Sequence, residues 1–84
     1  MTLALYVLAV PEFAPVVRCA EAAGMDVRAA GDYLELTTTA REVVLDREVT
    51  GMRTAVWHAA LTGGLVGRIV SFTPSTLHLA REDA

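Results

Sequence analysis

Three residue types are missing from this sequence of 84 residues: it contains no lysine, asparagine or glutamine. Arginine is therefore the only strong cation, with 7 residues against 10 aspartates and glutamates and a net charge of −3. So few positive charges cannot neutralise a phosphate backbone, which argues against nucleic acid as a partner. Because 54% of the residues are hydrophobic and 20% are charged, we expect residues 1–84 to fold as one globular domain.

Cysteine and long apolar segments are also scarce. Cys19 is the only cysteine, so the chain can form neither an internal disulfide nor a thiolate metal cage, and a cytoplasmic location is expected. The longest apolar run covers residues 3–10. A membrane-spanning helix needs about 20 apolar residues, and a secretory signal needs a basic start. The sequence therefore predicts no contact with a membrane.

The first quarter of the sequence predicts a strand followed by a helix. Residues 3–10 are uniformly apolar and are followed by a proline, as in a central strand covered on both faces. Pro11, Glu12 and Pro15 suit the first turn of a helix, where proline needs no donor and a carboxylate meets the positive end of the dipole. Apolar residues then recur three or four apart until Gly24, so we place the helix at about residues 12–23.

The central part predicts three strands. Apolar and polar residues alternate over 25–29 and again over 33–38, with a turn signal between them. The short, β-branched segment 42–46 favours a third strand over a helix. We expect these three strands to form an antiparallel meander.

The last part predicts a short helix and a closing hairpin. Residues 47–61 fit either a helix or a strand, and the alanines followed by two glycines favour a short helix. Residues 67–72 and 76–79 flank a turn and read as the hairpin. The predicted fold class is therefore α+β: a single small domain with a mostly antiparallel sheet and two helices, in the order β-α-β-β-β-α-β-β.

Few residues have the spacing that catalysis or metal binding requires. His58 and His78 lie 20 positions apart and no cysteine pair exists, so ordinary polar histidines are favoured over a metal site. Cys19 is interpreted as a small buried side chain rather than a nucleophile. We therefore expect no catalytic residues, no bound cofactor and no metal, and we expect the chain not to be an enzyme.

Two features near residue 60 each have a structural and a functional interpretation. Gly63, Gly64 and Gly67 do not follow the pattern of a nucleotide-binding loop. Their structural interpretation is that glycine allows a helix to end and the chain to turn sharply into the next strand. Their functional interpretation is that a backbone without side chains lets another protein approach closely. Trp57 either fills the core or anchors an interface. A small domain without catalytic groups generally works by binding, so the residues favour a protein–protein interaction module.

An ordered series of segments carries a resemblance to a known family. It consists of the apolar first strand followed by Val-Pro-Glu-Phe-Ala-Pro-Val-Val-Arg-Cys-Ala-Glu at 10–21, Gly-Asp-Tyr-Leu-Glu-Leu at 31–36, Arg-Glu-Val-Val-Leu-Asp-Arg-Glu at 41–48 and Leu-Val-Gly-Arg-Ile-Val at 65–70. Over nearly the whole chain this order resembles the effector, or coupling, proteins of bacterial multicomponent diiron monooxygenases, which oxidise methane, phenols, toluene or alkanes. The order of the segments carries the resemblance, since each alone is common.

The resemblance implies a regulatory component without a cofactor that docks on the hydroxylase near its diiron centre. There it would modulate oxygen activation, electron transfer and substrate access. The family's segment before the Gly-Arg pair contacts the hydroxylase. In this chain that segment holds Leu61 and two glycines where the family often carries an asparagine and small hydroxyl residues, which leaves Thr62 as its only side-chain hydrogen-bonding group. The implied partner-binding residues are Leu61, Thr62, Gly63, Gly64, Leu65 and Arg68, with Trp57 and His58 beside them.

Two other classes of function remain open from the sequence. The apolar first strand and the edge of the meander would also suit a small ligand-sensing or self-associating regulatory module, and the chain is expected to be a monomer or a weak homodimer. The third class is a cofactor-free enzyme that uses Cys19 or a histidine.

Overall fold

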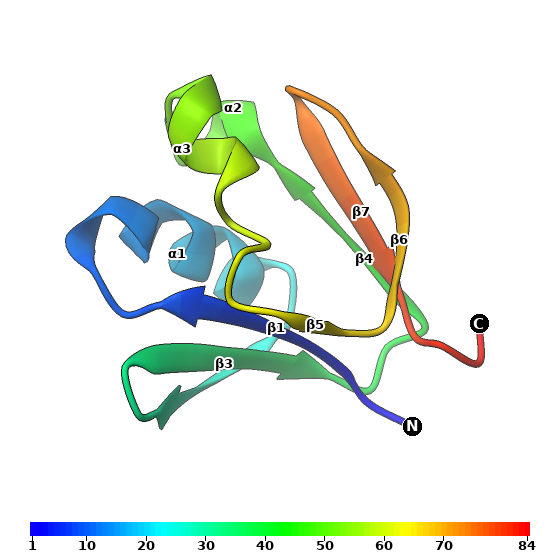
Figure 1. The fold of residues 1–84 in the computed structure, drawn as a ribbon. Coiled ribbons are helices and arrows are strands. Elements are labelled where there is room, and N and C mark those ends of the chain that lie inside the picture. The colour runs from blue at the N-terminus through cyan, green and yellow to red at the C-terminus, as the bar shows by residue number, and fades with distance from the viewer.

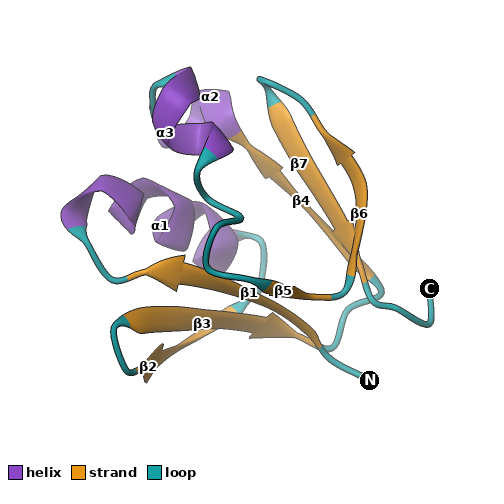
Figure 2. Ribbon diagram, viewed as in Figure 1, coloured by secondary structure: helices purple, strands orange, loops and turns teal.

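A computed structural model describes all residues from Met1 to Ala84. It has seven strands in two antiparallel sheets and short helices that lie along one side of both (Figure 1; Figure 2). The α+β fold class predicted from the sequence is confirmed. No helix is both long and apolar enough to cross a membrane.

The first sheet contains four strands in the order β2-β3-β1-β5. Strand β1 (Leu3–Leu8) lies between β3 (Tyr33–Thr38) and the two-residue strand β5 (Leu65–Val66), and β2 (Asp26–Ala30) forms the far edge. The central position predicted for the first strand is therefore confirmed, but only one of its faces is fully covered. Leu3, Leu5 and Val7 lie on one face of β1 and are buried. Leu8 lies on the opposite face and is 38% exposed.

The second sheet contains three strands in the order β4-β7-β6. Strands β6 (Arg68–Phe72) and β7 (Thr76–Ala80) form the predicted closing hairpin, and β4 (Glu42–Asp46) pairs with the other side of β7. Val43, Leu45, Leu77 and Leu79 point into the core from this sheet. The two sheets therefore share one hydrophobic core.

The predicted meander of three strands is wrong at its last step. Strands β2 and β3 form the expected hairpin, but β3 has β1 on its other side, and so it offers no free edge to β4. The chain instead crosses over after Thr38, and β4 joins the second sheet beside β7. The single predicted sheet is accordingly two sheets.

The helices differ from the prediction mainly in the middle of the chain. The first begins with a single turn, η1 (Pro11–Phe13), and continues as α1 (Ala14–Ala22), close to the predicted bounds. The second predicted helix is two short ones, α2 (Arg47–Thr50) and α3 (Thr54–His58). The Asp46 side chain caps α2 by accepting a 2.8 Å hydrogen bond from the Glu48 backbone N–H, and Gly51 ends it after one turn.

Side chains from both sheets and all the longer helices meet in a core of 15 buried residues. Trp57 on α3, Val16 and Ala20 on α1, and Leu36 on β3 belong to it, each 0% exposed. Burial of a larger apolar side chain such as Val16 or Leu36 is worth roughly 1.5–3 kcal/mol. This core fixes the position of the segment between α3 and β6, where the resemblance places the partner-binding residues.

Candidate partner-binding surface

The predicted contact segment is a tight loop that connects α3 to β5. The Thr62 hydroxyl and backbone N–H both donate to the Ala59 carbonyl, at 2.7 Å and 3.1 Å, and the Gly64 N–H donates to the Leu61 carbonyl at 3.2 Å. At its far end the Gly64 carbonyl accepts a 3.0 Å hydrogen bond from the Tyr6 N–H on β1. The loop is thus held at both ends, while Thr62 remains exposed.

The two adjacent glycines of this loop have different roles. At Gly63 an added Cβ would collide with the Tyr6 backbone carbonyl and would lie 3.1 Å from a Tyr33 ring carbon, so only glycine lets the loop lie this close to β1. At Gly64 an added Cβ would meet no atom within 4 Å, but the φ angle of +110° disfavours any side chain. Gly63 is therefore a packing residue, whereas Gly64 has open space beside its Cα and hydrogen-bonds its own N–H and carbonyl within the chain.

Trp57 and His58 are neighbours with opposite environments. The Trp57 side chain is 0% exposed, its ring packs edge-on against Phe72 with centroids 6.1 Å apart, and its Nε1 donates a 3.0 Å hydrogen bond to the Thr73 carbonyl. Of its two interpretations, the structure places Trp57 in the core, which corrects its inclusion among the contact residues. His58 is exposed, with its ring centroid 5.2 Å from that of Phe72, and so it remains available for contact.

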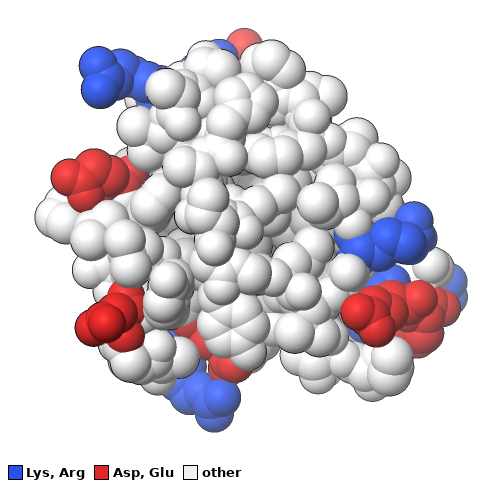
Figure 3. All heavy atoms as spheres, in the orientation of Figure 1, with Lys and Arg blue, Asp and Glu red and all other residues white.

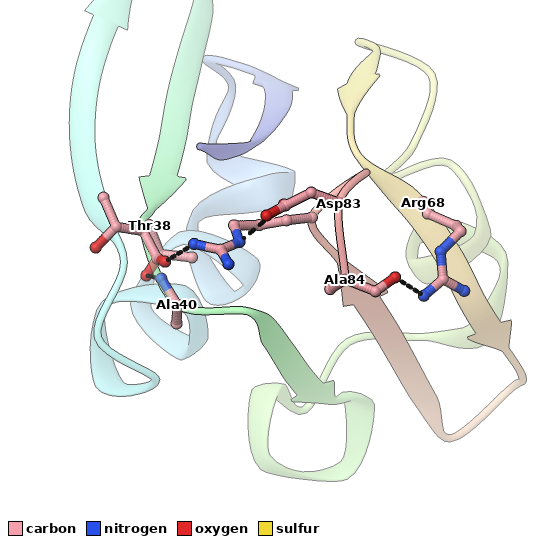
Figure 4. A network of polar contacts seen from close by, with 7 residues as sticks. Thr38, Ala40, Arg68, Asp83 and Ala84 are labelled. Atoms are coloured by element: carbon pink, nitrogen blue, oxygen red, sulfur yellow. Dashed lines mark hydrogen bonds and ion pairs between the residues drawn. The ribbon is translucent and has the colours of Figure 1, made fainter. Parts of the chain in front are cut away.

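Arg68 lies apart from the loop, at the start of β6. Its Nη2 donates a 2.7 Å hydrogen bond to the Ala84 carbonyl oxygen, as Figure 4 shows. In the same region Arg81 donates to the Thr39 carbonyl at 2.8 Å and forms an ion pair with Asp83 at 3.1 Å. Arg68 therefore holds the last residues against the second sheet, and its charge lies at the margin of the segment that begins at Leu61.

The stretch of chain that contains the loop and the closing hairpin carries almost no charge. Residues 54–80 contain no aspartate, glutamate or lysine, and Arg68 is their only arginine. Val66, Ile69 and Val70 lie on this stretch and are 49%, 48% and 44% exposed. In the view of Figure 3, acidic and basic atoms lie at the periphery and uncharged atoms fill the middle. We call the exposed parts of residues 61–66 and of β6 the neutral face.

Composition makes the neutral face suitable for binding a protein. The cores of protein–protein interfaces are depleted in charged residues, because removing a charge from water costs free energy. A surface held by internal hydrogen bonds also loses little conformational entropy on binding. The sequence contained a signal for this face, namely the charge-free stretch, but the contribution of β6 follows only from its exposure in the structure.

A polar network lies on the outer face of the first sheet, and the sequence analysis missed it. Tyr6, Glu35 and Arg28 are directly opposite one another on β1, β3 and β2. The Tyr6 hydroxyl donates to Glu35 Oε2 at 2.6 Å, and Arg28 Nη2 donates to Glu35 Oε1 at 2.7 Å. The three line a shallow hollow of about 690 Å³. Because register across three strands is a tertiary property, no local sequence pattern reveals this network.

The network shifts two pKa values in opposite directions. The hydrogen bond from Tyr6, supported by the charge of Arg28, lowers the pKa of Glu35 below its usual value. The same hydrogen bond, together with desolvation and the nearby carboxylate charge, raises the pKa of Tyr6. Glu35 is thus held ionised and Tyr6 neutral, which suits a structural hydrogen bond better than proton transfer.

The remaining candidate residues do not come together. Cys19 is half-buried on α1 and packs against the core. His78 lies on β7 with its Nε2 3.4 Å from Glu42 Oε1, and His58 lies at the end of α3. No three histidine, cysteine, aspartate or glutamate side chains are close enough to hold a metal ion.

No protein-family model matches this chain, and no curated protein matches it either.

Proposed function

We propose that this chain is a non-catalytic effector component of a bacterial multicomponent diiron monooxygenase, which acts in the cytoplasm by binding the hydroxylase through the neutral face. The observation that carries this proposal is the loop at residues 61–65, which backbone hydrogen bonds hold in place, which exposes Thr62, and which adjoins a stretch of chain almost free of charge. The segment that the family resemblance associates with the hydroxylase is the one that joins α3 to this surface. The partner would oxidise an aromatic or alkane substrate.

Binding would regulate the hydroxylase through a difference in affinity. An effector shifts a conformational equilibrium only as far as it binds one conformation more tightly than the other. A preformed loop suits this role, since it presents one fixed surface and selects the hydroxylase conformation that matches it. Oxygen activation, electron transfer and substrate access would then change together, because all three depend on the conformation around the diiron centre.

The test is to add the purified chain to the hydroxylase and reductase components of a multicomponent diiron monooxygenase from the same organism. Turnover or product distribution should change with the concentration of the chain and saturate, and the two proteins should coelute from a sizing column. Unchanged kinetics together with separate elution would contradict the proposal.

Two variants that introduce the same charge locate the contact. Thr62→Glu places a carboxylate in the exposed part of the loop, whereas Ala40→Glu places one in the connection between β3 and β4. Thr62→Glu should raise the concentration needed for half-maximal stimulation by about tenfold, because the new charge must be desolvated on binding. Ala40→Glu should leave that concentration within about twofold. Equal effects of both variants would place the contact elsewhere.

A further inference from the structure

Four strands form the open edges of the two sheets, and three of them are protected against pairing with another chain. Strand β2 carries Asp26 and Arg28, and β5 is only two residues long. Strand β4 has Glu42 and Asp46 at its ends and continues directly into α2. Charges and short length are the usual means by which proteins prevent pairing at an edge. These three edges therefore need no covering partner.

The fourth edge, β6, lacks such protection over most of its length. After Arg68 it continues as Ile69, Val70, Ser71 and Phe72, without a charge or a proline. None of these residues makes a backbone hydrogen bond outside the sheet, and β7 is the only neighbouring strand. The outer edge of β6 thus presents unpaired backbone groups beside β-branched side chains.

Strand β6 has an irregularity in its pairing next to two exposed apolar side chains. Ile69 is paired with Leu79 and Ser71 with the next residue of β7, His78, so Val70 has no partner across the ladder. Bulges of this kind bend a strand and redirect its side chains. Ile69 and Val70 are consecutive and yet both are nearly half exposed, at 48% and 44%.

From these observations we propose that the free edge of β6 pairs with a short, extended and uncharged segment of the hydroxylase, which adds a strand to the second sheet. This inference rests on the proposed effector function and extends its contact surface from the loop onto β6. Addition of a strand supplies affinity through backbone hydrogen bonds and specificity through alternate side chains. The bulge at Val70 limits the length of a straight added strand, so the segment is short.

The charge and the area of the surface around β6 determine which partner can bind there. A charged residue placed opposite Ile69–Phe72 would lose hydration without gaining an opposite charge, because these four residues of β6 carry no charge. A stable interface buries about 800 Å² on each partner, roughly a sixth of the 4595 Å² surface of this chain. The five residues of β6 cannot supply that area alone, so the same partner must also cover the loop. A large hydroxylase surface can do both.

The test compares two valine-to-lysine variants of the second sheet. Val70→Lys places a charge on the free edge, and Val44→Lys places one on β4, where the valine is 52% exposed. Calorimetric titration with the hydroxylase should give a Kd that is about tenfold higher for Val70→Lys and within about twofold of wild type for Val44→Lys. The melting temperatures of both variants in isolation are measured to detect any loss of fold.

Hydrogen exchange on the wild-type chain gives a second measurement that needs no variant. The amides of residues 68–72 should exchange more slowly in the complex, and those of β4 should not change. A complex that forms without protection of β6, and with an unaltered Kd for Val70→Lys, overturns this inference but leaves the effector function standing. Protection of β6 in a homodimer without hydroxylase overturns it in favour of a second copy, and absence of any complex overturns both proposals.

Discussion

The Tyr6 hydroxyl donates a 2.6 Å hydrogen bond to Glu35 Oε2 and so joins β1 and β3, the two central strands of the first sheet. Arg28 on β2 donates to the other oxygen of the same carboxylate at 2.7 Å. Both carboxylate oxygens are therefore occupied, and the folded chain favours the ionised form of Glu35. The stability of the protein should consequently depend on pH at both ends of the scale.

In acid, the Glu35 network should lose its stabilising effect. The pKa of Glu35 is lowered below its usual value of 4.5 by the Tyr6 hydrogen bond and the Arg28 charge. Above pH 4.5 the ionised Glu35 contributes fully to the free energy of unfolding. As the pH falls below 4.5, the unfolded chain binds the proton first, so the contribution is lost progressively down to the folded-state pKa. Urea unfolding of wild type and Glu35→Gln should therefore show a difference at neutral pH that shrinks in acid.

Glu21→Gln serves as the control for this series, because Glu21 is an exposed carboxylate on α1. Its effect on stability should be small throughout. A difference between wild type and Glu35→Gln that persists unchanged in strong acid would contradict the proposed role of the ionised carboxylate.

In alkali, the same hydrogen bond should delay ionisation of Tyr6. Its pKa is raised above the usual value of 10.0, first by the hydrogen bond to Glu35 and then by desolvation. The stabilising effect is complete below pH 10.0 and is lost as the pH rises through the folded-state pKa, because the unfolded chain ionises first. Ultraviolet titration of Tyr33→Phe, which leaves Tyr6 as the only tyrosine, measures this pKa directly. When Glu35→Gln is added to Tyr33→Phe, the pKa of Tyr6 should fall towards 10.0.

Local patterns in the sequence predicted most strands but not their pairing. Alternation of apolar and polar residues identified β2 and β3, and a short β-branched segment identified β4, each within a residue or so of its observed bounds. That β1 occupies the edge of β3, and so displaces β4 into another sheet, depends on contacts between distant residues, which no local pattern encodes. The single predicted helix after β4 failed for a local reason, since Gly51 divides it.

The site could be predicted only in part. The family resemblance selected the loop, which is held by internal hydrogen bonds and exposed at Thr62, but it could not separate Gly63 from Gly64. Their difference depends on the distance to the Tyr6 carbonyl, a tertiary property. The absence of acidic residues between Arg53 and Arg81 is visible in the sequence, but the free edge of β6 follows only from the order of strands in the second sheet.

Substitution of Trp57 should lower the stability of the core, and the fluorescence of Trp57 should not change when the partner binds. Replacing it by alanine removes a fully buried ring and its hydrogen bond to the Thr73 carbonyl, and should cost about 3–5 kcal/mol of unfolding free energy. As the only tryptophan, it should show blue-shifted fluorescence and weak quenching by acrylamide. Both properties should stay unchanged when the hydroxylase binds. A large change in quenching on binding would return Trp57 to the interface.

Substitutions at the two loop glycines should have separable effects. Gly63→Ala forces the new Cβ into the Tyr6 carbonyl, so the loop must move away from β1, at a cost of about 1–3 kcal/mol. Gly64→Ala meets no atom within 4 Å but strains the backbone at its φ of +110°, at a cost of the same order. Stability alone therefore does not distinguish the two variants, and a charged substitution at Gly64 would disturb the fold as well as any complex.

Hydrogen exchange at Tyr6 distinguishes them instead. The Tyr6 N–H donates to the Gly64 carbonyl, and this bond should open when Gly63→Ala displaces the loop. Its exchange rate should rise well beyond the change expected from the global loss of stability. In Gly64→Ala the loop keeps its contact with β1, so exchange at Tyr6 should follow global stability alone. If exchange of the Tyr6 amide is accelerated equally in both variants, beyond the change in global stability, the close approach of Gly63 to β1 is not what holds the loop in place.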